Sequence, residues 1–157
     1  MTAPYVAVIG ASRANEEQER HAEAVGAALG RAGAIVLCGG GPGVMAAASR
    51  GAAGEGATVV GLLPGDDRAH ANPWISVAIP TGIGELRNGL IVRACDVAIA
   101  VGGAYGTLSE IALALAQDVP VVGLGTWPID GVEVVPDPEA AVERALELAA
   151  GRRRPPA

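Results

Sequence analysis

One arginine and one glutamate are the strongest candidates in this sequence for chemistry on a small ligand. Arg87 stands in a mostly apolar segment, and Glu110 follows the glycine-rich stretch at 102–107. An arginine that faces a ligand can hold a phosphate or carboxylate through two parallel hydrogen bonds. A glutamate can act as a general base or stabilise a cationic transition state. Each residue also has an ordinary alternative, because Arg87 could be a surface residue with a buried stem and Glu110 could cap a helix start.

Three glycine-rich segments predict an anion site made from main chain. They read Gly10-Ala-Ser-Arg13, Gly39-Gly-Gly-Pro-Gly43 and Gly102-Gly-Ala-Tyr-Gly-Thr107. Glycines let the backbone come close to a ligand, and the free amides at a helix start attract an anion. The alternative is that these glycines only make tight turns and allow helices to pack closely on a sheet. The expected ligand- or phosphate-binding residues are Gly10, Ser12, Arg13, Gly39, Gly40, Gly41, Gly43, Val44, Met45, Asn88, Gly102, Gly103, Gly106 and Thr107.

The elements that would position these residues alternate between strand and helix. Apolar runs of strand length occur at 5–9, 34–38, 58–63, 74–79, 96–101 and 119–124, and a short strand is expected within 126–135. Helical patterns occur at 16–31, 44–53, 85–94, 108–117 and 138–149. Because the strands are continuously apolar, helices should cover both faces of their sheet. The pattern predicts a Rossmann-like, doubly wound α/β fold with a mostly parallel sheet, which binds ligands beyond the carboxyl ends of its strands.

The chain is expected to form a single domain over residues 1–150. The remainder, Gly-Arg-Arg-Arg-Pro-Pro-Ala at 151–157, has the composition of a disordered tail with a solvated charge run. The segment 108–117 is apolar nearly all round, so we expect it to be fully buried or to form part of a subunit interface.

The composition excludes several classes of function. All 11 basic residues are arginines, so the chain has no lysine for a Walker-type phosphate loop or a Schiff base. It has no Phe and only two Trp and two Tyr, which disfavours a base-stacking surface for nucleic acid. The net charge of −6 further disfavours nucleic acid and anionic membranes as partners. An anionic ligand must therefore be held by backbone amides and one or two arginines.

The cysteine and histidine content gives no sign of a metal site. Cys38 and Cys95 lie far apart, each near the end or start of an apolar run, and are expected to be buried thiols in a cytoplasmic protein, with a disulfide or a reactive thiol as the alternative. The two His residues join no Cys/His cluster with ligand spacing. The N-terminus lacks a signal-peptide pattern, and no apolar stretch reaches membrane-spanning length.

Two of the glycine segments, with the residues after them, resemble the LONELY GUY group, long mislabelled as lysine decarboxylases. The matching segments are Gly39-Gly-Gly-Pro-Gly-Val-Met-Ala-Ala-Ala48 and Gly102-Gly-Ala-Tyr-Gly-Thr-Leu-Ser-Glu110. They are similar to the GGGxxGxM and PGGxGTxxE patterns of that group. The founding enzymes hydrolyse the N-glycosidic bond of cytokinin riboside 5′-monophosphates. The resemblance implies catalytic roles for Arg87 and Glu110, and a homodimer or homotetramer.

Two positions depart from the group's pattern. Asn88 replaces the lysine that follows the arginine, and Val101 replaces the proline before the glycine pair. An Arg-Asn pair with this second turn looks more like a sister branch that includes molybdenum cofactor carrier proteins, which bind a pterin phosphate without converting it.

The sequence thus predicts a cytoplasmic protein that binds a small phosphorylated, nucleotide-like ligand. The main hypothesis is a nucleoside 5′-monophosphate phosphoribohydrolase-like enzyme that needs no cofactor. In such an enzyme Glu110 would stabilise an oxocarbenium-like state or activate water. The alternatives are a non-catalytic carrier with the molybdenum cofactor as its ligand, or a nucleotide-sensing module.

Overall fold

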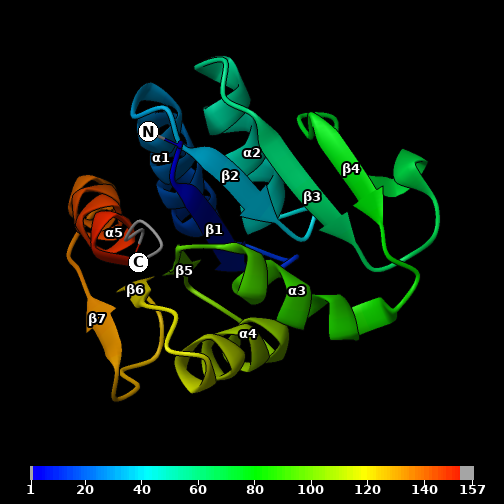
Figure 1. Ribbon diagram of the computed structural model, residues 1–157. Coiled ribbons are helices and arrows are strands. Elements are labelled where there is room, and N and C mark those ends of the chain that lie inside the picture. Colours follow the sequence, from blue (N-terminus) through cyan, green and yellow to red (C-terminus); the bar gives the residue numbers. More distant parts are fainter. Residues whose placement is uncertain (1, 153–157) are drawn as a thin grey trace.

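Seven strands form one sheet in the computed structural model, which describes residues 2–152 (Figure 1). The strands are β1 (Tyr5–Gly10), β2 (Ile35–Cys38), β3 (Val59–Leu63), β4 (Val77–Pro80), β5 (Val97–Val101), β6 (Val121–Leu124) and β7 (Val132–Val134). Their order across the sheet is β4-β3-β2-β1-β5-β6-β7, and every neighbouring pair is parallel. The predicted Rossmann-like α/β fold is confirmed, with a sheet that is parallel throughout.

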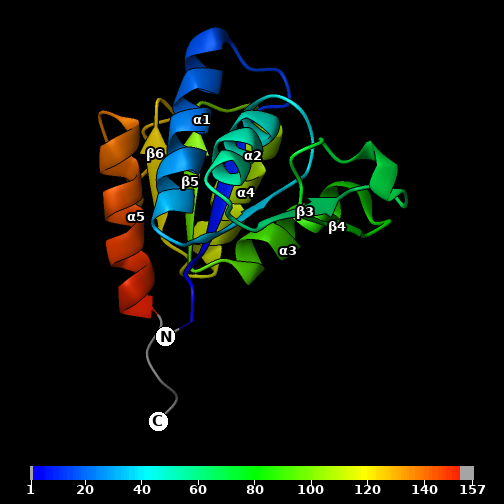
Figure 2. The ribbon, with the colours of Figure 1, turned by 90° about the horizontal axis from the view of Figure 1, so that it is seen from above.

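Five α-helices cover the sheet on both faces. They are α1 (Glu16–Arg31), α2 (Val44–Gly54), α3 (Arg87–Ala94), α4 (Tyr105–Ala116) and α5 (Pro138–Arg152). Helices α1, α2 and α5 pack on one face, while α3 and α4 pack on the other (Figures 1 and 2). Two short 3-10 turns, Arg68–His70 and Gly84–Leu86, lie in the connections on either side of β4.

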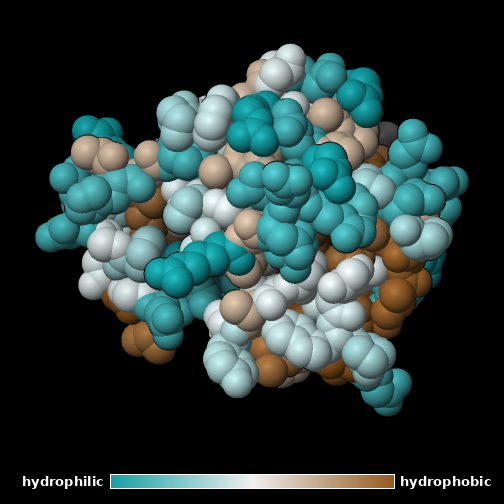
Figure 3. Space-filling model, turned by 180° about the vertical axis from the view of Figure 1, so that it is seen from behind, coloured by the Kyte–Doolittle hydropathy of each residue, from teal (hydrophilic) through white to brown (hydrophobic). Residues whose placement is uncertain are grey.

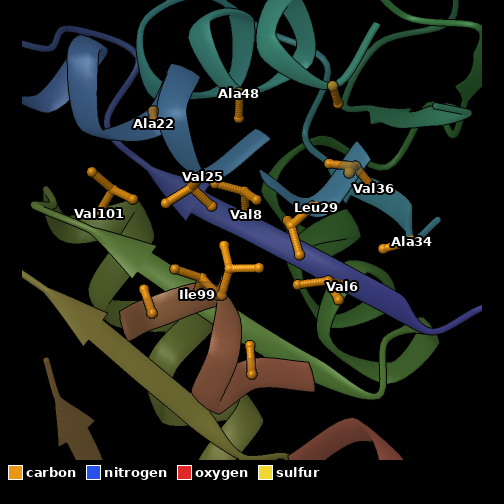
Figure 4. Packing of buried hydrophobic residues seen from close by; sticks show 14 of the residues in the cluster. Val6, Val8, Ala22, Val25, Leu29, Ala34, Val36, Ala48, Ile99 and Val101 are labelled. Atoms are coloured by element: carbon orange, nitrogen blue, oxygen red, sulfur yellow. The ribbon is translucent and has the colours of Figure 1, made fainter. Parts of the chain in front are cut away.

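Alternate residues of each central strand supply two hydrophobic cores. On β1, Val6 and Val8 face α1, whereas Ala7 and Ile9 face the side covered by α3 and α4. All four side chains are buried, as expected for a parallel strand with both faces covered. Figure 4 shows Val6 and Val8 beside Ile99 of β5, with side chains of α1 above them. The continuous apolar runs of the sequence therefore reflect burial on both faces.

Two glycines bring α1 and α2 into close contact. A Cβ atom at Gly26 would lie 2.0 Å from the Ala48 carbonyl oxygen, and one at Gly51 would lie 2.1 Å from the Glu23 carbonyl oxygen. No side chain fits at either position without moving the helices apart. The start of α1 is fixed separately by a capping box, in which the Asn15 side chain accepts from the Gln18 amide at 2.8 Å and the Gln18 side chain accepts from the Asn15 amide at 3.2 Å.

Some element boundaries differ from the sequence prediction. The helix expected from residue 85 begins at Arg87, after the 3-10 turn, and the helix expected from residue 108 begins three residues earlier, at Tyr105. Helix α5 continues through Gly151 and Arg152, so the expected tail at 151–157 is wrong for these two residues. The rest of that tail, 153–157, lies outside the described residues.

The surface carries both hydrophilic and hydrophobic side chains (Figure 3). In the view from behind, hydrophilic side chains cover most of the face and hydrophobic ones gather toward its lower right border (Figure 3). Helix α4 is only partly buried, because Ile111 and Ala114 lie in the core while Tyr105 and Leu113 are exposed. Full burial of this segment, one of the two expectations, is therefore wrong. Within residues 2–152 no helix has the length and apolar character needed to span a membrane.

Candidate functional site

The candidate site lies where the chain direction across the sheet reverses. From β1 the chain runs outward to β2, β3 and β4 on one side, and later to β5, β6 and β7 on the other. Residue Gly10 at the end of β1 pairs in register with Val101 at the end of β5. The loop at 10–13 and the turn at 102–107 therefore leave the sheet side by side. Such a reversal point is where open parallel sheets bind ligands.

A pocket of about 220 Å³ opens at this point. Its walls come from the loop after β1, the start of α2, the start of α3 and the first two turns of α4. The lining residues are Gly10, Ala11, Ser12, Met45, Glu85, Arg87, Asn88, Ala104, Gly106, Thr107 and Glu110. The structure thus brings Arg87 and Glu110, which are far apart in the sequence, to one cavity.

The side chain of Arg87 is only partly satisfied by the protein. Its Nη1 donates a hydrogen bond to Oδ1 of the buried neighbour Asn88. Its Nε is buried and has no hydrogen-bond partner within residues 2–152. A buried donor without a partner is costly, so such a group is usually satisfied by water or a ligand. Asn88 thus contacts the guanidinium, and Arg87 lines the pocket, where its cationic group can meet an anionic ligand.

Glu110 is a buried carboxyl group, with 7% of the residue exposed. Burial raises its pKa from 4.5 to about 7, and the nearby Arg87 guanidinium opposes part of that rise. The group can therefore give or accept a proton near neutral pH. Because α4 begins at Tyr105, Glu110 stands in the second turn and is not placed to cap the helix, which excludes the capping alternative.

The turn at 102–107 presents unpaired amides to the pocket. Gly102 and Gly103 have positive φ values of 57° and 150°, which let the chain turn sharply from β5 into α4. The N–H groups of the first helical turn have no acceptor inside the helix, and Gly106 and Thr107 in that turn line the pocket. The Thr107 hydroxyl accepts from the Ala104 amide at 3.3 Å. This helix start favours an anionic group.

The turn at 39–43 packs against the loop after β1 and does not itself line the pocket. A Cβ atom at Gly43 would lie 2.4 Å from the Ala11 carbonyl oxygen, and the Val44 amide donates to that same oxygen at 3.1 Å. Asn72 also holds this turn, because its main-chain N–H donates to the Gly40 carbonyl at 2.8 Å. The turn thus fixes the loop after β1. Within 39–45, the pocket lining includes only Met45.

The remaining predicted residues take other places. Arg13 is exposed and does not line the pocket, and Gly102 and Gly103 line a neighbouring recess instead. Sequence reasoning missed Ala11, Ala104 and Glu85 as lining residues. The first two lie inside predicted glycine segments. No sequence pattern marks Glu85 as a lining residue, because the 3-10 turn before α3 places it at the pocket.

The described residues hold no group of three or more His, Cys, Asp or Glu side chains that could bind a metal ion. Cys38 and Cys95 are both free and buried, and burial raises the pKa of the Cys95 thiol to about 12. Neither thiol is placed to act as a nucleophile, because the thiolate is disfavoured at neutral pH.

The parallel sheet, with its pocket at the reversal point, defines a Rossmann-like α/β protein. The model of the SLOG cluster4 family matches residues 3–149, and the chain belongs to this family. The family match and the structural matches reported below confirm the resemblance to the LONELY GUY group and its molybdenum cofactor carrier branch.

Known proteins match over nearly the whole chain. An uncharacterised protein of Archaeoglobus fulgidus is 40% identical over 142 residues, which make up 90% of this chain and 93% of that protein. The molybdenum cofactor binding protein of Rippkaea orientalis superposes with a TM-score of 0.89 at 31% identity, covering 94% of this chain and 98% of that one. The molybdenum cofactor carrier protein of Chlamydomonas reinhardtii gives a TM-score of 0.88 at 33% identity, covering 95% and 99%.

Proposed function

We propose that this protein binds the molybdenum cofactor, a pterin carrying a phosphate, in the pocket at the β1–β5 reversal and carries it without converting it. The observation that carries this proposal is the near full-length similarity to two proteins described by that ligand, at 31% and 33% identity. The ligand is cargo in this proposal, and the chain supplies binding groups rather than chemistry.

The pocket offers groups that suit a pterin phosphate. The amides of Gly106 and Thr107 at the start of α4 would take the phosphate. The guanidinium of Arg87, which lines the pocket, would donate to an oxygen of the ligand. Protonated Glu110 can donate a further hydrogen bond, and a neutral carboxyl there would not repel the phosphate.

Co-purification tests this proposal directly. The chain, produced in a host that makes the cofactor, should retain molybdenum and a fluorescent pterin, measured by metal analysis and after acid oxidation. Arg87→Ala should lower the retained amount about tenfold or more, as expected for loss of a charge-assisted hydrogen bond. Arg68→Ala is the matched control, because Arg68 is exposed and does not line the pocket. Wild-type protein without molybdenum or pterin would refute the proposal.

A second candidate function is N-glycosidic hydrolysis of a nucleoside 5′-monophosphate. Two features favour it: Arg87 and Glu110 line one cavity, and the pKa of Glu110 is raised to about 7. In this reaction Glu110 would activate water or stabilise the oxocarbenium-like state, and Arg87 would hold the phosphate or polarise the leaving base. Release of free base from AMP, GMP, CMP, UMP or cytokinin riboside monophosphates tests this candidate. An activity that Glu110→Gln leaves unchanged would contradict the role of Glu110.

We also propose that the protein is a cytoplasmic homodimer or homotetramer that associates through α3 and α4. The outer sides of these helices carry apolar residues one or two turns apart. On and before α3 these are Leu86 and Leu90, exposed by 79% and 45%, and on α4 they are Tyr105 and Leu113, exposed by 89% and 38%. Helices α3 and α4 pack against each other, so the exposed side chains can form one patch. A second copy of the chain would cover this patch.

A further inference from the structure

A second recess adjoins the pocket across the turn at 102–107. It has a volume of about 310 Å³ and lies at the carboxyl ends of β5 and β6. Gly102 and Gly103 line this recess, whereas Ala104, Gly106 and Thr107 line the first pocket. A single short turn therefore separates two cavities at the same edge of the sheet.

Gly103, in the turn between the two cavities, lies close to side chains that line each of them. A Cβ atom there would lie 2.7 Å from Cζ3 of Trp127 and 3.2 Å from Cβ of Thr107. The edge of the Trp127 indole ring thus approaches the backbone of the turn with no side chain between them. Trp127 therefore borders the turn on the side of the second recess, and Thr107 belongs to the lining of the first pocket.

The groups in the second recess suit a planar ring with polar edges. All of its lining residues are uncharged, and Trp127 supplies an aromatic surface. The Thr126 hydroxyl oxygen is buried and has no hydrogen-bond partner within residues 2–152. The Gln18 side chain lies against Gly102, and its Oε1 accepts from the Asn15 amide, which leaves its NH₂ group to donate. An aromatic surface beside an unpartnered hydroxyl and an amide is typical of sites for a heterocyclic base.

We propose that the two cavities form one site for a dinucleotide-type ligand, in which two planar rings are joined through a pyrophosphate. The pyrophosphate lies on the turn at 102–107, one ring enters the pocket beside Arg87, and the other stacks on Trp127. This inference rests on the proposed function for the placement of phosphate on the turn. It adds that a ligand with a second ring binds more tightly than one with a single ring.

Fluorescence titration tests the second ring site, because the chain has only two tryptophans. Trp74 lies elsewhere, with the Arg50 guanidinium carbon 5.3 Å from its ring centre. In Trp74→Phe protein, Trp127 is the only tryptophan, and diadenosine pyrophosphate should quench its emission. In Trp127→Phe protein, where Trp74 is the reporter, the same probe should cause little quenching.

Comparison with ADP isolates the effect of the second ring, because both probes carry a pyrophosphate. Calorimetry on wild-type protein should show diadenosine pyrophosphate binding about tenfold or more tightly than ADP, within the range that base–aromatic stacking gives. Trp127→Ala should remove this gain, so that diadenosine pyrophosphate binds no more tightly than ADP, and Trp127→Phe should keep most of it. Trp74→Ala is the matched control and should change neither affinity.

The inference would be overturned by equal affinities for the two probes, by no binding of either, or by no quenching in Trp74→Phe protein. Equal weakening of both probes by Trp127→Ala would show a structural effect and would also contradict it. Molybdenum and pterin retention is measured separately. If the cofactor is retained but the second ring gives no gain, the two-ring site is wrong while the proposed function stands. If neither is seen, both fail.

Discussion

The guanidinium of Arg87 lies directly over Gly39, so close that a Cβ atom there would stand 2.9 Å from both terminal nitrogens. The same Cβ atom would lie 2.8 Å from the sulfur of Met45. Both neighbours are the ends of flexible side chains that line the pocket. Arg87 can therefore occupy this position only because residue 39 has no side chain, although Gly39 does not itself line the cavity.

Gly39→Ala should weaken ligand binding while leaving the fold intact. The new methyl group would displace Arg87 and Met45 rather than the backbone, because the three atoms nearest to it are ends of their side chains. We expect retained molybdenum and pterin to fall several-fold, with little change in the thermal midpoint. Gly65→Ala, in a loop where no atom lies within 4 Å of the new Cβ, should change neither. Full retention in Gly39→Ala protein would show that the position of Arg87 does not matter.

Glu110 should make the protein less stable as the pH rises. Its pKa in the folded chain is about 7 against 4.5 for the free group, so the folded state holds the proton more tightly. The free energy of unfolding therefore decreases between pH 4.5 and 7, by about 3 kcal/mol in total from this group. Glu110→Gln removes this loss. Urea unfolding should show that the advantage of the variant over wild type is small at pH 4.5 and grows until about pH 8.

A carboxylate in the same pocket provides the control for that pH series. Glu85 lines the pocket but is exposed, so Glu85→Gln should not show a comparable increase relative to wild type. If the stabilities of Glu110→Gln and wild type differ by a constant amount at every pH, the carboxyl is not buried in a way that shifts its pKa.

Gly26→Ala should destabilise the fold. Its methyl group would meet the Ala48 carbonyl oxygen at 2.0 Å, and only separation of α1 from α2 would relieve this contact. Overpacking of this kind costs about 1–3 kcal/mol. Gly54→Ala, which lies in α2 with no atom within 4 Å of the new Cβ, should be neutral or stabilising by less than about 1 kcal/mol. Denaturant unfolding that ranks the two variants equally would contradict the close helix contact.

Charged substitutions on the outer sides of α3 and α4 should dissociate the proposed oligomer. Leu90→Glu and Leu113→Glu would place carboxylates in a patch that a second copy must cover, and burying an unpaired charge is costly. Light scattering at micromolar concentration should give a dimer or tetramer for wild type and a monomer for the double variant. Val134→Glu, on the exposed strand β7, is the control and should keep the wild-type mass. A monomeric wild type would refute this proposal.

The sequence was sufficient to predict the layers of the fold and the sheet edge at which the candidate pocket lies. Strand runs buried on both faces and glycine segments after strands are local patterns that follow from the parallel sheet. Helix α1 has the predicted bounds, because Asn15 and Gln18 form a local capping box and Gly33 adopts a positive φ after its end.

Features that depend on tertiary contacts were not predictable. The expected strand from residue 74 begins at Val77, because the preceding residues follow Asn72, which is held by the turn at 39–43. No sequence pattern marks Trp127 as a possible binding residue, since its place depends on contact with Gly103, 24 positions earlier in the chain. The side of α4 that remains exposed also depends on how α3 packs beside it.

The register pairing of Gly10 with Val101 has a consequence for folding. The two halves of the pocket are separated by most of the chain, and no fragment that lacks either β1 or β5 can contain the site. Contacts of such long sequence separation form slowly, and they form only when the centre of the sheet is complete. A bound ligand therefore stabilises the whole folded chain rather than one loop, so occupancy and global unfolding are thermodynamically linked.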